Sequence, residues 1–234
     1  MATKKTKGKW IVKLLKAAVT AYLLLILCQM IGNAYSRLSI THKIPVSEEW
    51  NLIVVNRWNE LPEDYSVELT ELSNGQKVDS RIYPYLQEMF DAARAEGIYP
   101  IVREGYRTAE EQQEILDDKI QTYINQGYSQ SRAEKTAKEW VALPGTSEHQ
   151  LGIAVDINAD KSKCSNEDVY GWLAENAYKY GFVLRYPPGK QKITGTSYEP
   201  WHYRYVGEEA AKEIYERGIC LEEYFMQMIE EVGL

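Results

Sequence analysis

The sequence predicts a single α+β domain built around a small antiparallel sheet with flanking helices. Strand and helix signals do not alternate regularly along the chain, as they would in a fold with a parallel sheet. The Asn-Gly pair at 74–75 lies between two short apolar runs, which is a strong signal for a hairpin of antiparallel strands. The length of 234 residues and the hydrophobic share of 44% allow one core of ordinary size.

The first half of the domain is expected to begin near Asn51. Apolar residues at helical spacing precede Gly97, a natural C-cap, and therefore predict a helix that ends there. Thr108 and Glu111 have the spacing of a capping box, so another helix should start directly after Arg107. The expected elements are a strand at 52–55, hairpin strands at 67–72 and 76–78, a helix from 82, a strand at 98–103 and a helix from 108.

The second half predicts three more strands and several helices. Alternating apolar residues indicate a half-buried strand at 152–157. Ser165 or Asn166 is expected to cap a helix that ends at Gly181. The other expected elements are a helix at 131–141, paired strands at 182–186 and 202–206 around a Pro-Pro-Gly turn, and helices at 208–217 and 221–231.

The N-terminus combines a basic tail with an apolar run. Six lysines and no acidic residue precede Ala17, and the run continues to Ile31. Because Lys13 and Lys16 can extend their amines to the membrane surface, a helix that includes them is long enough to span a bilayer with its basic end inside. The predicted organisation is a cytoplasmic tail at 1–9, a single-pass transmembrane signal anchor at 10–34, a tether at 35–50 and an extracytoplasmic domain at 51–234.

The alternative for this segment is a signal peptide that is cleaved after the small residues Gly32 and Ala34. In either case the domain is exported, and disulfides are allowed there. Cys164 and Cys220 are the exported pair, and both a bridge and two separate thiols remain open.

The charge distribution excludes one functional class. The net charge is −7, and after residue 16 the chain has 21 basic and 34 acidic residues without a basic cluster. A nucleic-acid-binding protein needs a basic patch, so nucleic acid is not an expected partner.

Two of the three histidines lie beside carboxylates and suggest a metal site. His149, Asp156 and His202 supply two imidazoles and a carboxylate, the three-ligand set of a catalytic zinc that keeps one position open. Asp156 lies within an otherwise apolar strand, where a charge is costly unless it is paired or bound to a metal. We therefore predict one zinc ion per chain.

A catalytic zinc also needs a base. Glu199 precedes His202 by three residues and is expected to take a proton from the attacking water and to give it to the leaving amine. Glu148 adjoins His149 and is the competing candidate. On an extended segment neighbouring side chains point to opposite faces, so Glu148 should face away.

Three polar residues near these motifs are further candidates. Arg107 lies at a strand-to-helix junction, where a fixed guanidinium could stabilise an oxyanion or hold a carboxylate. Gln112 lies on the first turns of the following helix, and Ser147 would share the face of His149 on an extended strand. Spacing alone favours a structural role for each of them.

The motif Ser147-x-His149-x-x-Gly152-x-Ala154-x-Asp156, followed by Glu199-x-x-His202, resembles the motif pair of the VanY-type D-alanyl-D-alanine carboxypeptidases. These are zinc peptidases of peptidoglycan, and the resemblance covers about residues 51–225, including Gly105-Tyr106-Arg107-Thr108. One departure is Glu104, where many relatives have serine.

This resemblance implies a role for each candidate residue. It implies zinc bound by His149, Asp156 and His202, with Glu199 as the catalytic base. It also implies that Arg107 polarises the scissile carbonyl. Positions matching Gln112 and Ser147 help to bind the D-alanine end of the peptide in the family.

The expected function is therefore a zinc-dependent carboxypeptidase that removes the C-terminal D-alanine from peptidoglycan stem peptides at the outer face of the cell membrane. Both D,D- and L,D-bonds remain possible. The alternatives are a non-catalytic peptidoglycan-binding module with a structural zinc, and a cell-wall lytic endopeptidase. The position of Glu199 favours an enzyme over a binding module, which would not need a base.

Overall fold

The computed structural model describes residues 44, 47 and 49–232. The predicted cytoplasmic tail, membrane anchor and most of the tether lie outside these residues. Within the described part of the chain, no helix has the length and apolar character needed to cross a bilayer.

The first predicted strand, at 52–55, is wrong. The chain forms a short 3₁₀-helix η1 (Trp50–Leu52) and then continues extended without pairing with a strand. Its apolar residues alternate between two cores, and the guanidinium of Arg204, 2.9 Å from the carbonyl oxygen of Ile53, takes the place of a neighbouring strand. The alternation of a strand is present, but both faces of the segment are buried.

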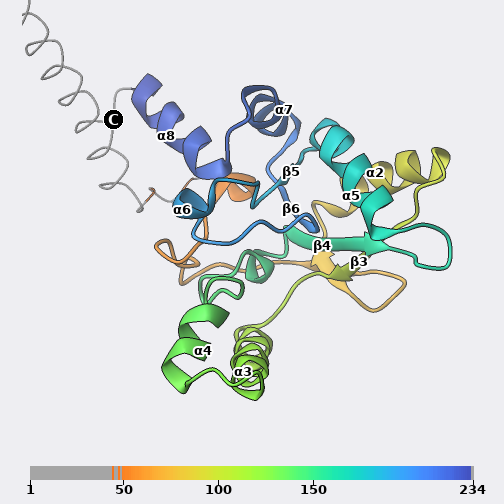
Figure 1. Ribbon diagram of the computed structural model, residues 1–234. Coiled ribbons are helices and arrows are strands. Elements are labelled where there is room, and N and C mark those ends of the chain that lie inside the picture. Colours follow the sequence, from red (N-terminus) through yellow and green to blue (C-terminus); the bar gives the residue numbers. More distant parts are fainter. Residues whose placement is uncertain (1–43, 45–46, 48, 233–234) are drawn as a thin grey trace, which may run out of the picture. The chain divides into compact units, whose positions relative to one another are not determined.

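The hairpin and the antiparallel sheet are confirmed. Strands β1 (Leu69–Glu71) and β2 (Lys77–Asp79) pair on either side of the Asn-Gly turn. A separate four-stranded antiparallel sheet has the order β3-β4-β6-β5 (Figure 1). Its strands are β3 (Pro100–Glu104), β4 (Ala154–Ala159), β5 (Phe182–Leu184) and β6 (His202–Tyr205).

The helices agree with the prediction in most places. They are α2 (Tyr83–Ala95), α3 (Ala109–Asn125), α4 (Gln130–Ala137), α5 (Asn166–Asn176), α6 (Gln191–Thr194), α7 (Glu208–Arg217) and α8 (Leu221–Val232). The helix expected up to Gly181 changes after α5 into the 3₁₀-helix η3 (Ala177–Tyr180). The short α6 was not predicted, and α4 ends four residues before the predicted end at 141.

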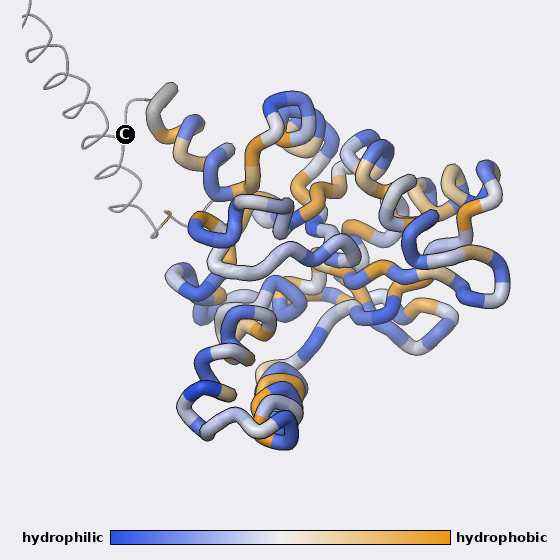
Figure 2. Tube along the Cα trace, viewed as in Figure 1, coloured by the Kyte–Doolittle hydropathy of each residue, from blue (hydrophilic) through white to orange (hydrophobic). Residues whose placement is uncertain are grey.

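The main core lies between the sheet and helices α2 and α5 (Figure 2). Strand residues Val155, Ile157 and Tyr203 pack there with apolar side chains of both helices, including Leu86 and Leu173. These side chains are almost completely buried, so the sheet is fixed on this side.

A second, smaller core joins α7 and α8 to the N-terminal part of the domain. Its buried residues include Ile44, Leu52, Val183, Ile214 and Leu221. The amide of Ile44 also donates a hydrogen bond of 2.7 Å to the side chain of Asn59. Ile44 belongs to the predicted tether, so at this residue the chain is already packed on the domain.

Cys164 and Cys220 are both free thiols. Of the two possibilities that the sequence left open, the structure has two separate cysteines. Burial raises the pKa of the Cys220 thiol to about 12.

Candidate metal centre

The register of the sheet brings Asp156 and His202 together. Asp156 on β4 lies directly opposite His202 on β6, and residues opposite each other in an antiparallel pair share one face of the sheet. The Nδ1 atom of His202 is 2.9 Å from Asp156 Oδ1. His149 approaches from the preceding segment, with Nε2 3.5 Å from the same carboxylate oxygen.

These three residues form a cluster that could hold a metal ion. Their candidate ligand atoms all lie within 4.8 Å of one another, and both histidines are buried. The sequence prediction of His149, Asp156 and His202 as neighbours is therefore confirmed geometrically.

The orientation of His149 comes from its second ring nitrogen. Nδ1 lies 2.7 Å from the carbonyl oxygen of Gly105 and donates to it, so Nε2 is the nitrogen that faces Asp156. The Gly105 segment rests on the β1–β2 hairpin: a Cβ atom at this position would lie 2.2 Å from the carbonyl oxygen of Lys77. Only glycine allows this approach, and the hairpin thereby fixes the carbonyl that orients His149.

The segment around His149 is not extended, contrary to the prediction. Residues Glu148–Leu151 form the 3₁₀-helix η2, and Gly152 ends it with a positive φ of 75°. The prediction that Glu148 faces away assumed an extended segment, and this assumption is wrong. The prediction itself still holds, because Glu148 points away from the cleft that contains His149.

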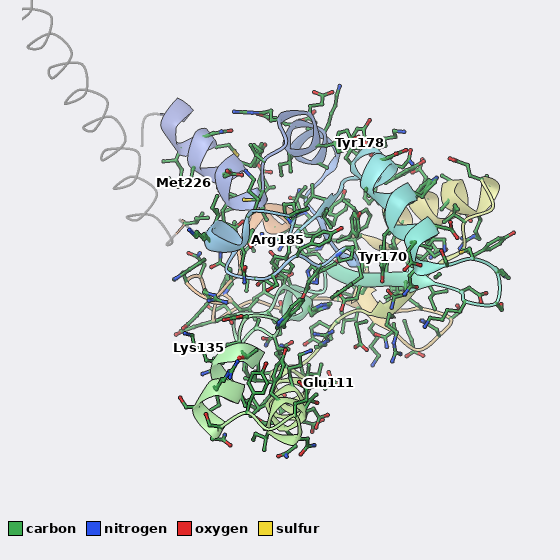
Figure 3. The ribbon with its side chains drawn as sticks, viewed as in Figure 1. Glu111, Lys135, Tyr170, Tyr178, Arg185 and Met226 are labelled. Atoms are coloured by element: carbon green, nitrogen blue, oxygen red, sulfur yellow. The ribbon has the colours of Figure 1, made fainter. Side chains whose placement is uncertain are left out.

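Glu148 belongs to a charge cluster behind His202, formed by Glu148, Arg185, Arg204 and Glu222. Arg185 Nε lies 2.7 Å from Glu148 Oε1 and donates hydrogen bonds to Glu222 as well. All four side chains are buried, and Figure 3 shows Arg185 among crowded side chains while Glu111 and Lys135 lie at the periphery. Burial alone would raise the pKa of Glu148, but Arg185 and Arg204 outweigh it and hold that pKa well below its usual range.

The charge cluster faces the second nitrogen of His202. Glu148 Oε2 lies 3.7 Å from His202 Nε2, and both atoms are buried without a hydrogen-bond partner. A small movement would allow Nε2–H to donate to this carboxylate. Nδ1 would then be left free for a metal, the usual arrangement of a ligating histidine held from behind.

Glu199 lies on the opposite side of His202, in the cleft. Its Oε2 atom is 3.8 Å from His202 Nδ1, and its side chain is 9% exposed. Burial raises the pKa of Glu199 to about 7, although the charges of His202 and Arg107 partly offset this effect. A carboxyl with such a pKa can accept and return a proton near neutral pH.

Arg107 also reaches the metal ligands. The predicted capping box of Thr108 and Glu111 is present and starts α3 directly after Arg107. The guanidinium lies 3.4 Å from Asp156 Oδ2 and 3.6 Å from Glu104 Oε2. Glu104 is thus a neighbour of Arg107, and the junction directs the arginine to the cluster.

Gln112 and Ser147 line the same cavity. The side-chain amide of Gln112 donates to the carbonyl oxygen of Ala142 over 2.9 Å, and its Oε1 atom lies 3.4 Å from Arg107. Ser147 is buried and directly precedes η2. The seven predicted site residues therefore line one cavity, and they are Arg107, Gln112, Ser147, His149, Asp156, Glu199 and His202.

The cavity has a volume of about 360 Å³. Besides the predicted residues, it is lined by side chains for which no role was predicted, among them Lys119, Tyr123, Trp140, Tyr186 and Trp201. Tyr186 packs against the His202 ring, with centroids 4.8 Å apart. The high tyrosine and tryptophan content was the available signal, but it did not identify which residues line the cleft.

The donor set fits zinc. Two imidazole nitrogens and one carboxylate oxygen converge, and a structural zinc site would normally have four protein ligands. Burial and the nearby charge of Arg107 lower the pKa of His149 to about 4, whereas for His202 burial is outweighed by contacts with Asp156 and Glu148, which raise its pKa to about 9 in the metal-free protein. Burial would raise the pKa of Asp156, but His149 and His202 hold it well below its usual range.

Comparisons with known proteins agree with this geometry. Residues 75–208 match the family model of VanY, D-alanyl-D-alanine carboxypeptidase. A D-alanyl-D-alanine carboxypeptidase of Enterococcus faecalis is 61% identical over 177 residues. That alignment covers 76% of this chain and 66% of the relative, so the chain spans slightly less than two thirds of that protein.

Several solved structures resemble this chain, and two of them share 61% of their sequence with it. One is a mutant of the vancomycin-resistance D,D-pentapeptidase VanY from the VanB-type cassette in complex with Zn(II), with a TM-score of 0.74 and 61% identity. It is matched over 99% of its length and 75% of this chain. The other is VanYB in complex with D-alanine-D-alanine, with the same TM-score and identity over 97% of its length and 75% of this chain.

Proposed function

The chain belongs to the VanY family of D-alanyl-D-alanine carboxypeptidases, and on this premise we propose that it is a zinc-dependent carboxypeptidase that removes D-alanine from the end of peptidoglycan stem peptides. The observation that carries the proposal is the convergence of His149, Asp156 and His202 with Glu199 in one cavity. The complexes of the relatives with Zn(II) and with D-alanine-D-alanine support both the metal and the substrate class.

In this proposal zinc, when bound, supplies a Lewis acid that activates water and polarises the scissile carbonyl. His149 Nε2, His202 Nδ1 and one oxygen of Asp156 hold the metal. The carbonyl oxygen of Gly105 restrains the opposite nitrogen of His149, and Glu148 lies 3.7 Å from the opposite nitrogen of His202, close enough to restrain it after a small movement.

Glu199 is the proposed proton carrier. Its carboxylate takes a proton from the attacking water and gives it to the nitrogen of the departing D-alanine. A pKa near 7 in the buried cleft suits both transfers. Glu148 is unsuited to this role because Arg185 and Arg204 hold its pKa low.

Arg107 is the proposed stabiliser of the oxyanion that develops on the scissile carbonyl. It lies beside Asp156, so its fixed guanidinium is close to the position where this charge appears. Gln112 is within 3.4 Å of Arg107, and Gln112 and Ser147 are proposed to contact the D-alanine end of the substrate.

We further propose that the domain acts outside the cell, attached to the membrane by the helix predicted at 10–34. Six lysines before Ala17 support an orientation with the N-terminus inside. Protease added to intact spheroplasts should remove the domain. Protection of the domain would contradict this orientation, and a soluble mature form starting at Tyr35 would indicate a cleaved signal peptide instead.

Two measurements test the enzymatic proposal. Mass spectrometry of muropeptides after incubation with the purified 35–234 fragment should show loss of one terminal D-alanine, and pentapeptide and tetrapeptide substrates distinguish D,D- from L,D-cleavage. Elemental analysis should find about one zinc per chain, lost with activity on chelation. Unchanged muropeptides would favour a binding module. Cleavage within crosslinks would favour an endopeptidase. A fully active metal-free preparation would refute the zinc site.

A further inference from the structure

Lys119 gives the catalytic cavity a second cationic side chain. It lies on α3 between Ile115 and Tyr123, at intervals of four residues that place all three on one face of the helix. All three line the cavity that contains the metal cluster. Lys119 is half-buried there, so α3 presents an ammonium group to the space in which the substrate must lie.

The surroundings of Lys119 differ from those of Arg107. Arg107 lies near two carboxylates, those of Asp156 and Glu104. Within the described part of the chain, Lys119 has no carboxylate within ion-pair distance, and its contacts are the rings of Tyr123 and Trp140, at 5.7 and 5.9 Å from Nζ. The rings restrain the ammonium group without neutralising its charge.

Lys119 also shares its cavity with the reaction centre. Glu199 and the metal cluster line the same space of about 360 Å³. In a carboxypeptidase substrate one residue separates the scissile peptide bond from the terminal carboxylate. One residue of extended chain spans about 3.3–3.6 Å, so the carboxylate lies close to the reaction centre. A terminal carboxylate can therefore lie between the reaction centre and Lys119.

We infer that Lys119 binds the carboxylate at the C-terminus of the substrate and thereby restricts the enzyme to terminal cleavage. The inference rests on the proposed function and adds a specificity-determining residue to it. A carboxylate that enters a buried cavity is strongly unfavourable unless a cation meets it. The lysine ammonium is a compact charge on a flexible stem, which suits a small terminal residue such as D-alanine.

The test uses two peptides that both end in D-alanyl-D-alanine, one with a free acid and one with a terminal amide. Wild-type protein should prefer the free acid by about 10- to 100-fold in kcat/KM, the range expected for a charge-assisted hydrogen bond. Lys119→Met should lose this factor on the acid, mainly through KM, and should cleave the amide as wild type does. Lys119→Arg keeps the charge and should retain most of the preference.

Lys135→Met is the matched control, because Lys135 is an exposed lysine on the neighbouring helix α4 and does not line the cavity. It should leave the preference unchanged. Zinc content and thermal unfolding of each variant distinguish lost recognition from a lost fold. If Lys119→Met misfolds, Lys119→Gln takes its place in the comparison of acid and amide peptides. Inhibition by free D-alanine is then also compared between wild type and Lys119→Arg, which keeps the charge.

Three results would overturn the inference. If Lys119→Met keeps the acid preference while wild type releases D-alanine, Lys119 does not bind the terminus, and the proposed function stands. If Lys119→Met loses discrimination between peptides with internal D-isoglutamate and D-isoglutamine instead, the lysine binds an internal carboxylate. If wild-type protein releases no D-alanine from any peptide, the proposed function fails and the inference fails with it.

Discussion

Two buried glutamates lie on either side of His202 and have opposite surroundings. Glu148 is enclosed by Arg185 and Arg204, with a nitrogen of each within 3.1 Å, and its pKa is held well below the usual range. Glu199 has no arginine within ion-pair distance among the described residues, and burial raises its pKa to about 7. The same side chain is therefore a fixed charge in one place and a proton carrier in the other.

The charge cluster around Glu148 and the cavity around Glu199 also differ in how their charged groups are paired. The charge cluster contains two arginines and two glutamates, so its formal charges cancel and most of its hydrogen bonds are made within the protein. The cavity contains His149, Asp156, Glu199 and Lys119, and among the described residues neither Glu199 nor Lys119 forms an ion pair with a fixed opposite charge. The region whose charges lack such partners is therefore the one arranged for a metal and a substrate.

The largest expected effect concerns the base. Glu199→Ala should reduce turnover by about two to four orders of magnitude, the usual contribution of a positioned base. Zinc content and thermal stability should remain close to wild type, because Glu199 is outside the ligand set. Steady-state kinetics together with elemental analysis measure both. If Glu199→Ala has normal turnover, Glu199 is not the base and does not differ from Glu148 in this respect.

Glu148 should give the opposite result. Glu148→Ala leaves Arg185 and Arg204 buried with too little negative charge, and we expect a loss of about 3–5 kcal/mol in the free energy of unfolding. Urea denaturation of the zinc-free protein measures this loss, with Glu199→Ala as the matched control. If Glu148→Ala is stable but abolishes turnover, Glu148 acts in proton transfer and the assignment of Glu199 is wrong.

Substitutions of Arg107 test whether a positive charge at this position is sufficient for turnover. Arg107→Ala and Arg107→Lys should each lower turnover by roughly a hundredfold or more, as for the loss of one oxyanion donor. Lysine keeps the charge but loses the planar fork, so it should not rescue turnover. Melting temperatures should change little. Strongly lowered melting with normal turnover of the folded fraction would make Arg107 a scaffold residue.

The smallest effect is a dependence of stability on pH in the zinc-free protein. The pKa of Glu199 is about 7 in the folded state against 4.5 ordinarily, so the folded state binds this proton more tightly than the unfolded chain. Its contribution is complete below pH 4.5 and is lost as the pH rises to about 7. Relative to Glu199→Gln, wild-type stability should fall by about 1–3 kcal/mol across this window. If this stability instead increases as the pH rises, the ionised carboxylate of Glu199 has a stabilising partner in the folded state.

The sequence was sufficient for features that depend on local patterns. The capping box, the Asn-Gly hairpin and the helix at 208–217 follow from neighbouring residues and are confirmed. The metal cluster was also accessible, because the histidines are few and Asp156 interrupts an apolar strand. The strand predicted at 52–55 failed because both of its faces meet tertiary partners, one in each core.

Other parts of the site depend on contacts between distant segments. Glu148 appeared as a possible base, and only Arg185 and Arg204, far along the chain, show why its charge is fixed. Lys119 is an ordinary helix lysine in the sequence, and its position in the cavity follows from the packing of α3 beside the sheet ligands. Local periodicity carries no information about such neighbours.

The charge cluster also has a consequence for biosynthesis. Glu148, Arg185 and Arg204 all lie before α8, and Glu222 on α8 is the last of the four to be synthesised. Until that helix is available to the fold, two arginines are matched by one glutamate, and burial of the set would leave one positive charge uncompensated. A chain synthesised from its N-terminus therefore needs α8 before the charge cluster behind His202 is neutral. Assembly of the metal site is thus postponed until α8 has been synthesised.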